Sequence, residues 1–330
     1  MPTVELFQLP EEFLIAGAAV KNGIFEALKN KALARQELAA VTGSDQRALW
    51  TLTEALVSLG YIEYEAEKLK LTEACYSILY DKESPDYQGF SFMHSYYLIS
   101  KWLDLPKILK TGKPVPKSES FEEKRSFIEA MSSYAEEDAS DIAEYCLKGH
   151  PPGTEVLDIG GGPLTIARAF AQRGAVVTVL DLPEVVDMMK SELDPGLPVK
   201  MVKGDFTSNL PEGPFALAYL GHICHIYGEK EIKKLFIEVA GKLVDGGRVI
   251  INDFIRGTGP YPAVFAVNML VNTDSGGTWT FEQYKTWLED AGFTVTPYVE
   301  VGDNQLIKAH KQSQWASGLY RNKITDNDPV

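Results

Sequence analysis

The sequence predicts an α/β protein in which a doubly wound, mainly parallel sheet follows a mainly helical N-terminal region. Two observations lead to this prediction. From residue 154 onwards, short segments rich in Val, Ile and Leu alternate with segments whose apolar residues have helical spacing. Before residue 151 the spacing is helical almost throughout. The length of 330 residues is also long for one core, so we expect two domains.

The N-terminal region has the element order of a winged helix. Ser44 or Asp45 is a good N-cap for the last short helix before a hairpin, and Gly60 is a good stop for it. Over residues 61–72 the side chains alternate in character along the chain, and this alternation predicts the hairpin. The expected elements are helices over 11–29, 34–43, 44–60, 91–112 and 121–148, and a hairpin over 61–72.

The C-terminal region starts after the turn at residues 151–153. Buried strands and amphipathic helices alternate there, which favours a parallel sheet with helices on both faces. We expect strands over 154–162 (running into a glycine loop), 175–181, 198–205, 215–220 and 247–254, helices over 164–173, 183–193 and 229–244, and closing strands over 293–301 and 305–311. Residues 312–330 are polar and predict a loose tail.

Charge and cysteine content exclude several classes of function. The net charge of −14 disfavours nucleic acid and anionic membranes as partners. Cys75, Cys146 and Cys224 have no paired spacing and predict reduced thiols in a cytoplasmic protein. The N-terminus shows no signal-peptide pattern, and no apolar run approaches the ~20 residues of a membrane helix.

The glycine loop "VLDIGGGP" indicates a cofactor site at the carboxyl ends of the strands. Glycines allow the backbone to approach a ligand closely. Gly160 and Gly162 fit a dinucleotide fingerprint, but its third glycine is Thr165 here. With Asp158 two residues before the first glycine, the pattern favours S-adenosylmethionine over a nicotinamide cofactor. Asp181 ends the second strand, where a carboxylate can hold ribose hydroxyls.

The third strand ends in "KGDF", which completes an adenosine site. Asp205 can accept a hydrogen bond from an adenine amino group, and Phe206 can lie against the ring. Each of these signals is weak alone. Three of them in order at successive strand ends are typical of an adenosine-containing cofactor.

Taken together, these features resemble those of a known protein family, and the resemblance extends over residues 10–311. The motifs "ELAAVTG", "LVSLGYIE", "KLTEACYSIL" and "WLDLPKILKTGKPV" in the first part, and "VLDIGGGP", "VLDLPEVV", "VKGDF", "ICHIY" and "TFEQYKTWLEDAGF" in the second, carry the resemblance. The family that the chain resembles is the caffeic acid / hydroxyindole O-methyltransferase group of class I S-adenosylmethionine-dependent methyltransferases. The resemblance implies a Rossmann-like catalytic domain, a homodimer and a small, aromatic hydroxyl acceptor.

The resemblance also implies domain boundaries. A winged-helix dimerisation domain is expected over 1–112 and a helical linker over 113–150. The S-adenosylmethionine-binding catalytic domain is expected over 151–311, followed by the tail.

The resemblance assigns roles to individual residues. His225 falls on the catalytic base and Asp253 on the acidic residue that orients it. The residues implied for the cofactor are Asp158, Gly160, Gly162, Asp181, Leu182, Asp205, Phe206 and Tyr134, the last of which is also a candidate for the acceptor. The candidates for the acceptor pocket are Met131, His222, Phe92, His94, Tyr97, Met269 and Asn272.

The stretch "GHICHIYGE" also raises the question of a metal. His222, Cys224 and His225 have no second cluster of ligand residues at suitable spacing in the sequence, so we expect no metal site. For His222, we favour a structural role over a catalytic one, with its side chain pointing towards the cofactor side or the core.

Four positions depart from the family pattern. Leu164 stands where a glycine is common, Gly221 where plant members have lysine, and Ile226 and Phe281 where acidic residues are usual. These departures keep two alternatives open. One is a C- or N-methyltransferase, and the other is a non-methylating member of the fold with decarboxylase, hydroxylase or pericyclase chemistry.

A third alternative is a DNA-binding regulator that uses the winged helix. Residues 1–80 contain seven Lys and Arg against eleven Asp and Glu, a net of 7 − 11 = −4. Because DNA binding needs a positive face, this composition disfavours it.

Overall fold

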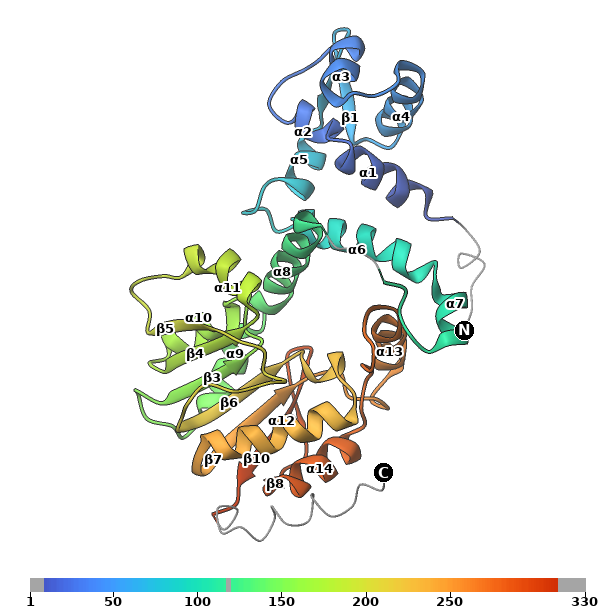
Figure 1. The fold of residues 1–330 in the computed structure, drawn as a ribbon. Helices are drawn as coiled ribbons and strands as arrows, with labels where there is room; N and C mark the ends of the chain where they lie inside the picture. The colour runs from blue at the N-terminus through green and yellow to red at the C-terminus, as the bar shows by residue number, and fades with distance from the viewer. Residues whose placement is uncertain (1–8, 117–119, 314–330) are drawn as a thin grey trace. The chain divides into compact units, whose positions relative to one another are not determined.

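The computed structural model describes residues 9–116 and 120–313 (Figure 1). The chain divides into two compact units, Met1–Ser100 with Glu119–Ala130, and Lys101–Ser118 with Met131–Val330. This division differs from the boundaries expected at residues 112 and 150. Helix α8 (Phe121–Glu136) contributes residues to both units. The sequence changes near residue 151 from mainly helical spacing to alternating strands and helices. This change marks the first strand of the sheet, and it does not mark the start of the compact unit.

The first unit contains the predicted winged-helix order of elements. Its elements are α1 (Glu11–Lys21), α2 (Ile24–Leu28), α3 (Arg35–Thr42), α4 (Gln46–Ser58), β1 (Ile62–Glu65), β2 (Lys68–Leu71), α5 (Glu73–Leu79), most of α6 (Gly89–Trp102) and the first part of α8. Asp45 caps α4 by accepting from the Ala48 amide at 2.9 Å. The helix expected over 11–29 is broken, because Gly23 adopts a left-handed φ of 70°.

The second unit is built on an eight-stranded sheet. Its strands are β3 (Glu155–Ile159), β4 (Val176–Asp181), β5 (Val199–Lys203), β6 (Phe215–Gly221), β7 (Leu243–Asn252), β8 (Phe293–Val295), β9 (Val299–Val301) and β10 (Asn304–Lys311). The order is β5-β4-β3-β6-β7-β10-β8, with β9 paired to β10. Strands β3 to β7 are parallel and β10 runs antiparallel to its neighbours. The strand order reverses between β3 and β6, where α/β sheets of this kind bind ligands.

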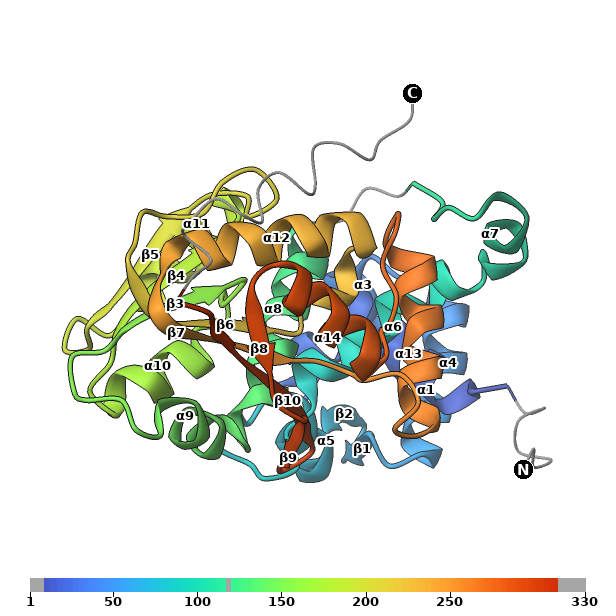
Figure 2. The same ribbon diagram turned by 90° about the horizontal axis from the view of Figure 1, so that it is seen from below.

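The helices of the second unit are α7 (Leu105–Thr111), α9 (Ala139–Leu147), α10 (Thr165–Gln172), α11 (Pro183–Met189), α12 (Glu229–Lys242), α13 (Pro260–Asn272) and α14 (Phe281–Asp290), with short 3₁₀ turns at Lys190–Glu192 and Cys224–Ile226. Some of them cover both faces of this sheet. Helices α9 and α10 pack together on one face, and α12 and α14 on the other (Figure 2). The doubly wound architecture is thus confirmed.

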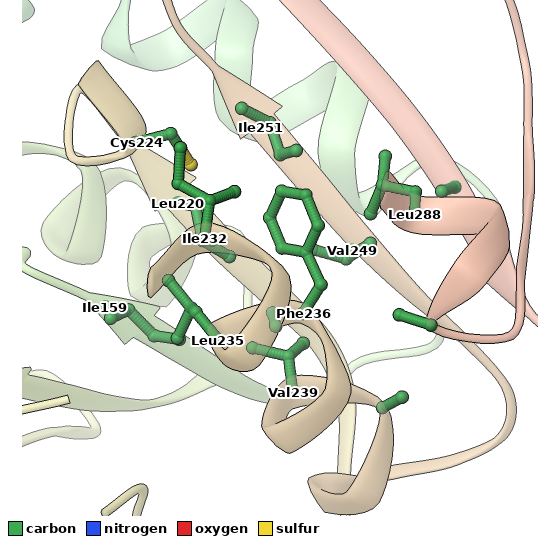
Figure 3. Close-up of a cluster of buried hydrophobic side chains, with 14 of the residues drawn as sticks. Ile159, Leu220, Cys224, Ile232, Leu235, Phe236, Val239, Val249, Ile251 and Leu288 are labelled. Atoms are coloured by element: carbon green, nitrogen blue, oxygen red, sulfur yellow. The ribbon is translucent and has the colours of Figure 1, made fainter. Parts of the chain in front are cut away.

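The main core lies between the sheet and helices α12 and α14. Phe236 of α12 projects toward Val249 and Ile251 of β7, and Leu288 of α14 closes the cluster (Figure 3). Cys224 is one of the buried members. Burial of these side chains fixes the carboxyl ends of β6 and β7, where the strands pair from Leu217↔Arg248 to Gly221↔Asn252.

Several boundaries differ from those expected. The helix expected over 91–112 is two helices, because Leu105–Thr111 starts anew with Pro106 in its first turn. Helix α13 is not predicted by the apolar spacing, since its sequence is apolar on most sides. Most of the expected tail, residues 314–330, lies outside the described residues. Among those that are described, no helix is both long and apolar enough to cross a bilayer.

Candidate active site

The glycine loop after β3 leaves no space for side chains. A Cβ at Gly160 would lie 2.5 Å from Ile223, one at Gly161 would lie 2.2 Å from the Asp158 carboxylate, and one at Gly162 would lie 2.4 Å from a Val185 methyl. Real Cβ atoms do not approach other atoms this closely. The loop therefore presents bare backbone at the reversal point of the sheet, as a cofactor site requires.

Two carboxyl groups flank this loop. Asp158 is buried, and its Oδ2 has no hydrogen-bond partner among the residues that the structure describes. Burial, with a contribution from the charge of Asp181, raises the pKa of Asp158 to about 7. Asp181 accepts from the Gly162 amide through Oδ2 at 2.8 Å and from the Leu182 amide through Oδ1 at 2.7 Å. These two bonds fix the Asp181 carboxylate at the end of β4, beside the loop.

The loop ends in a strained residue. Leu164 adopts a φ of 66°, in the left-handed region, and its side chain is buried. This conformation explains why a glycine would suit the position. Leucine at this position combines a buried side chain with a strained backbone.

The structure brings Asp205 and Phe206, the residues expected to contact adenine, to the same edge of the sheet. Asp205 follows β5 and accepts from the amide and hydroxyl of Thr207 at 2.8 and 2.7 Å. The ring of Phe206 meets that of Tyr227 edge-on, with centroids 5.0 Å apart. Burial, followed by the charges of Asp205 and Asp181, raises the pKa of Tyr227, so its hydroxyl lies near both carboxylates. The sequence analysis did not single out Tyr227, which lies beside these residues.

His225 and Asp253 form a buried pair. Nδ1 of His225 lies 2.7 Å from Oδ1 of Asp253, and the His225 backbone amide donates to Oδ2 at 3.0 Å. The Asp253 carboxylate also accepts from the Phe254 amide at 2.8 Å and from the Tyr284 hydroxyl at 3.4 Å. Burial raises the pKa of Asp253, but the neighbouring imidazoles outweigh burial and the net effect lowers it. The ionised carboxylate thus holds the proton of His225 on Nδ1 and leaves Nε2 as the basic nitrogen.

The sheet and one loop create this pair. His225 lies in the turn after β6, Asp253 follows β7, and these strands are parallel neighbours. The His225 carbonyl accepts from the Gly277 amide at 2.9 Å. A Cβ at Gly276 would lie 2.4 Å from the same carbonyl oxygen, so the loop before α14 fits closely against His225.

Aromatic rings surround the histidine. Phe265 of α13 meets the His225 ring edge-on at 4.9 Å, and Phe254 lies parallel to it at 6.0 Å. Phe254 and Phe265 are 4.4 Å apart, and Tyr261 lies 5.2 Å from Phe254. The spacing of Tyr261 and Phe265, four residues apart on one helix, is the signal that could have revealed this aromatic group.

His222 lies beside this group. It adopts a φ of 56°, and its amide donates to the Asn252 carbonyl at 2.8 Å. Its ring is 5.1 Å from Phe254 and 6.2 Å from His225. Burial lowers its pKa, so the imidazole is neutral at pH 7.

Ile226 and Phe281, which stand where acidic residues are usual in the family, have different surroundings. Ile226 is half-buried in the turn that carries His225. Phe281 packs against Tyr298 at 5.7 Å and against the main core. The groups around the His225–Asp253 pair come instead from His222, Phe254, Phe265, Tyr284 and the Gly277 amide.

Four other candidates belong to the second unit. Met131 is half-buried on α8, next to Ser132, whose hydroxyl lies 2.8 Å from that of Thr165 at the start of α10. Tyr134 is exposed but contributes to the raised pKa of Tyr261, after burial, which places it on the side of the aromatic group. Met269 is buried on α13. Asn272 donates to the Asn268 side chain at 3.0 Å.

Phe92, His94 and Tyr97 pack within the first unit. Phe92 contacts Phe13 with ring centroids 4.9 Å apart, and His94 contacts Phe127 at 5.3 Å. Tyr97 meets Tyr96 edge-on at 6.3 Å. All three side chains are half-buried, and their assignment to the acceptor pocket stays a prediction.

The doubly wound sheet, the bare glycine loop and the carboxylates at its strand ends define an enzyme that binds an adenosine cofactor. A family model described as "O-methyltransferase domain" matches residues 116–294, more than half of the chain. The protein belongs to this O-methyltransferase family.

Named relatives agree with this assignment. TcmO of Streptomyces glaucescens, a tetracenomycin polyketide synthesis 8-O-methyl transferase, is 29% identical over 303 residues, 84% of this chain and 86% of TcmO. The 3-hydroxy-5-methyl-1-naphthoate 3-O-methyltransferase of Streptomyces sahachiroi is 28% identical over 294 residues, 83% of this chain and 84% of the relative.

A solved structure supports the fold. PigF with SAH superposes with a TM-score of 0.75 at 22% identity, covering 91% of this chain and 96% of PigF. The PigF of a Serratia strain is described as an S-adenosyl-L-methionine-dependent methyl transferase. The present chain is an S-adenosylmethionine-dependent O-methyltransferase, and its side-chain-free loop with two flanking carboxyl groups fits that cofactor.

Proposed function

We propose that the protein methylates a hydroxyl group on a fused aromatic acceptor and that His225 is the general base. The observation that carries this proposal is the 2.7 Å contact between His225 Nδ1 and Asp253 inside a group of aromatic rings. S-adenosylmethionine supplies the electrophilic methyl group.

The chain's own task is to position the hydroxyl and remove its proton. A phenol has a pKa of about 10, so a base near neutrality is needed. Asp253 keeps the Nδ1 proton in place, and Nε2 of His225 then accepts the proton of the acceptor hydroxyl. The imidazolium that forms is stabilised by the adjacent carboxylate.

The aromatic acceptor follows from the side chains around His225. Phe254, Phe265 and Tyr261 offer flat apolar surfaces next to the base. A planar aromatic molecule can stack against such rings with its hydroxyl toward the histidine. TcmO acts in the synthesis of a polyketide and the Streptomyces sahachiroi enzyme acts on a naphthoate, which are acceptors of this shape.

For the cofactor, we assign the loop Gly160–Gly162 to close backbone contact, shaped by Asp158, and Asp181 to the ribose hydroxyls. Leu182, Asp205 and Phe206 are assigned to the adenine ring, together with Tyr227. Leu182 is 44% exposed at the end of β4, where an apolar side chain can lie on a base.

We also propose a homodimer formed through the first unit. Large apolar side chains remain exposed there, among them Leu9, Val41, Trp50 and Leu59. A surface of this kind favours a partner. Multi-angle light scattering at micromolar concentration is expected to give twice the monomer mass, and a monomer would contradict the proposal.

The function is tested with a panel of acceptors and methyl-labelled cofactor. Hydroxylated naphthalenes and anthraquinones are incubated with the enzyme, and NMR locates the methyl group in each product. Transfer to oxygen that is lost in His225→Gln supports the proposal. Transfer to carbon or nitrogen would favour the C- or N-methyltransferase. Conversion without methylation would favour the non-methylating alternative.

A further inference from the structure

His222, His225 and Asp253 form a cluster whose members come from two different strand ends. One ligand atom from each lies within 4.8 Å of the other two. Within residues 9–116 and 120–313, no other group of three or more His, Cys, Asp or Glu side chains is so placed. Spacing along the chain does not predict this set of three, because Asp253 is 28 residues from His225, and Cys224, the cysteine between the two histidines, is buried in the core.

We propose that these three side chains form a binding site for one Zn²⁺ ion, and that the bound ion blocks the enzyme. Two imidazoles and one carboxylate are a ligand set that zinc accepts, with a water molecule in the fourth position. Because the ion would be held by the imidazole that is proposed as the base, we expect it to inhibit methyl transfer.

The distances allow this coordination after a small adjustment. Zinc binds nitrogen and oxygen at about 2.0–2.2 Å, so tetrahedral ligands are separated by about 3.4 Å. The His225 and Asp253 atoms at 2.7 Å must move apart by about 0.7 Å, and His222 must approach by up to about 1.4 Å. We expect the larger movement to come from a rotation of the half-buried His222 side chain, which would give up its hydrogen bond to Asn304.

The surroundings of the cluster are largely apolar. His225 and Asp253 are buried, and the rings of Phe254 and Phe265 lie 5.1 Å from the His222 ring and 4.9 Å from the His225 ring, respectively.

Zinc at this site removes the base whichever nitrogen of His225 it takes. Coordination through Nδ1 replaces the proton shared with Asp253 and ends the control of the tautomer. Coordination through Nε2 occupies the lone pair that accepts the proton. The inhibition rests on the proposed role of His225, whereas the binding of zinc does not.

Zinc binding is measured by isothermal titration calorimetry on the full chain, and the ligands are identified with Co²⁺ by visible absorption. The wild type is expected to bind one ion per chain, with the intense visible bands of a four-coordinate site and no thiolate band. His222→Asn is expected to bind at least about tenfold more weakly. Asparagine tolerates positive φ, so this variant keeps the backbone. His310→Gln on β10 is the matched control and is expected to bind as the wild type does.

Binding that is unchanged in His222→Asn, or equally reduced in His310→Gln, would overturn the site. So would a cobalt spectrum dominated by thiolate ligation. Asp253→Asn gives a second check, since it must also weaken zinc. If zinc binds as expected but the methylation rate is unaffected, the site stands and the proposed base is wrong. If His225→Gln is inactive and zinc does not bind, the function stands and the site is wrong.

Discussion

The substitution Asp253→Asn changes the side chain that accepts the most hydrogen bonds in the site. The carboxylate accepts four hydrogen bonds, two at each oxygen. Oδ1 faces Nδ1 of His225 and the Phe254 amide, and Oδ2 faces the His225 amide and the Tyr284 hydroxyl. An Asn side chain is nearly the same size but has only one oxygen.

The magnitude follows from which group the amide nitrogen must face. If the nitrogen takes the Oδ2 position, it opposes the His225 backbone N–H. If it takes the Oδ1 position, it opposes the Phe254 N–H and also donates to Nδ1 of His225, which moves the ring proton to Nε2. Either way one buried backbone N–H loses its acceptor, at a cost of about 1–3 kcal/mol. The wrong tautomer, or a mispositioned ring, is expected to lower kcat by about 10²–10⁴.

Two assays separate these effects. Thermal or urea unfolding of Asp253→Asn reports the loss of stability, and steady-state kinetics with the best acceptor report kcat. Calorimetric titration with S-adenosylhomocysteine is expected to give an affinity close to that of the wild type. A variant that keeps full turnover, or that loses only cofactor affinity, would refute the reasoning.

Three further changes have distinct expected outcomes. Asp181→Ala removes the carboxylate assigned to the ribose and is expected to weaken S-adenosylhomocysteine at least about tenfold by calorimetry, by analogy with the loss of a charged hydrogen bond; an unchanged affinity would contradict the assignment. The raised pKa of Asp158, about 7, means that the folded protein holds a proton that the unfolded chain releases from about pH 4. This contribution to stability is present at low pH and is lost as pH rises through 7, so the cofactor-free wild type is expected to lose more melting temperature between pH 5 and pH 8 than Asp158→Asn does; parallel pH profiles would speak against it. Gly276→Ala places a methyl group 2.4 Å from the His225 carbonyl and is expected to lower kcat by at least about tenfold, whereas in Gly277→Ala the methyl has 3.7 Å of clearance and serves as the matched control. Equal kinetics in the two glycine variants would show that this loop does not position His225.

The meeting of three carboxyl groups at one edge of the sheet could be predicted from the sequence because it obeys a rule of topology. Asp158 lies near the end of β3, Asp181 ends β4 and Asp205 follows β5, and parallel strands end at one edge of the sheet. The meeting of His225 and Asp253 was expected only from the family resemblance. Spacing along the chain could not give it, since it depends on the pairing of β6 with β7.

Other features depend on backbone conformations that residue types do not reveal. Leu164 and His222 both adopt positive φ, which their side chains disfavour, and Gly23 breaks a helix whose apolar spacing is continuous. The aromatic group around His225 was missed because α13 is apolar on most sides, so its periodicity marks no single face. Tyr227 was not singled out because its contact with Phe206 joins the ends of two different strands.

The pH dependence of His225→Gln tests the central claim most directly. Single-turnover methylation of a phenolic acceptor is measured for the wild type and the variant from pH 6 to pH 10. A histidine base predicts a variant about 10²–10⁴ slower at pH 7, with normal affinity for S-adenosylhomocysteine. It also predicts that the deficit shrinks as pH approaches the acceptor's own pKa of about 10, because an ionised phenol needs no base. Full activity of His225→Gln at pH 7, or a deficit that stays constant across the whole range, would contradict the account.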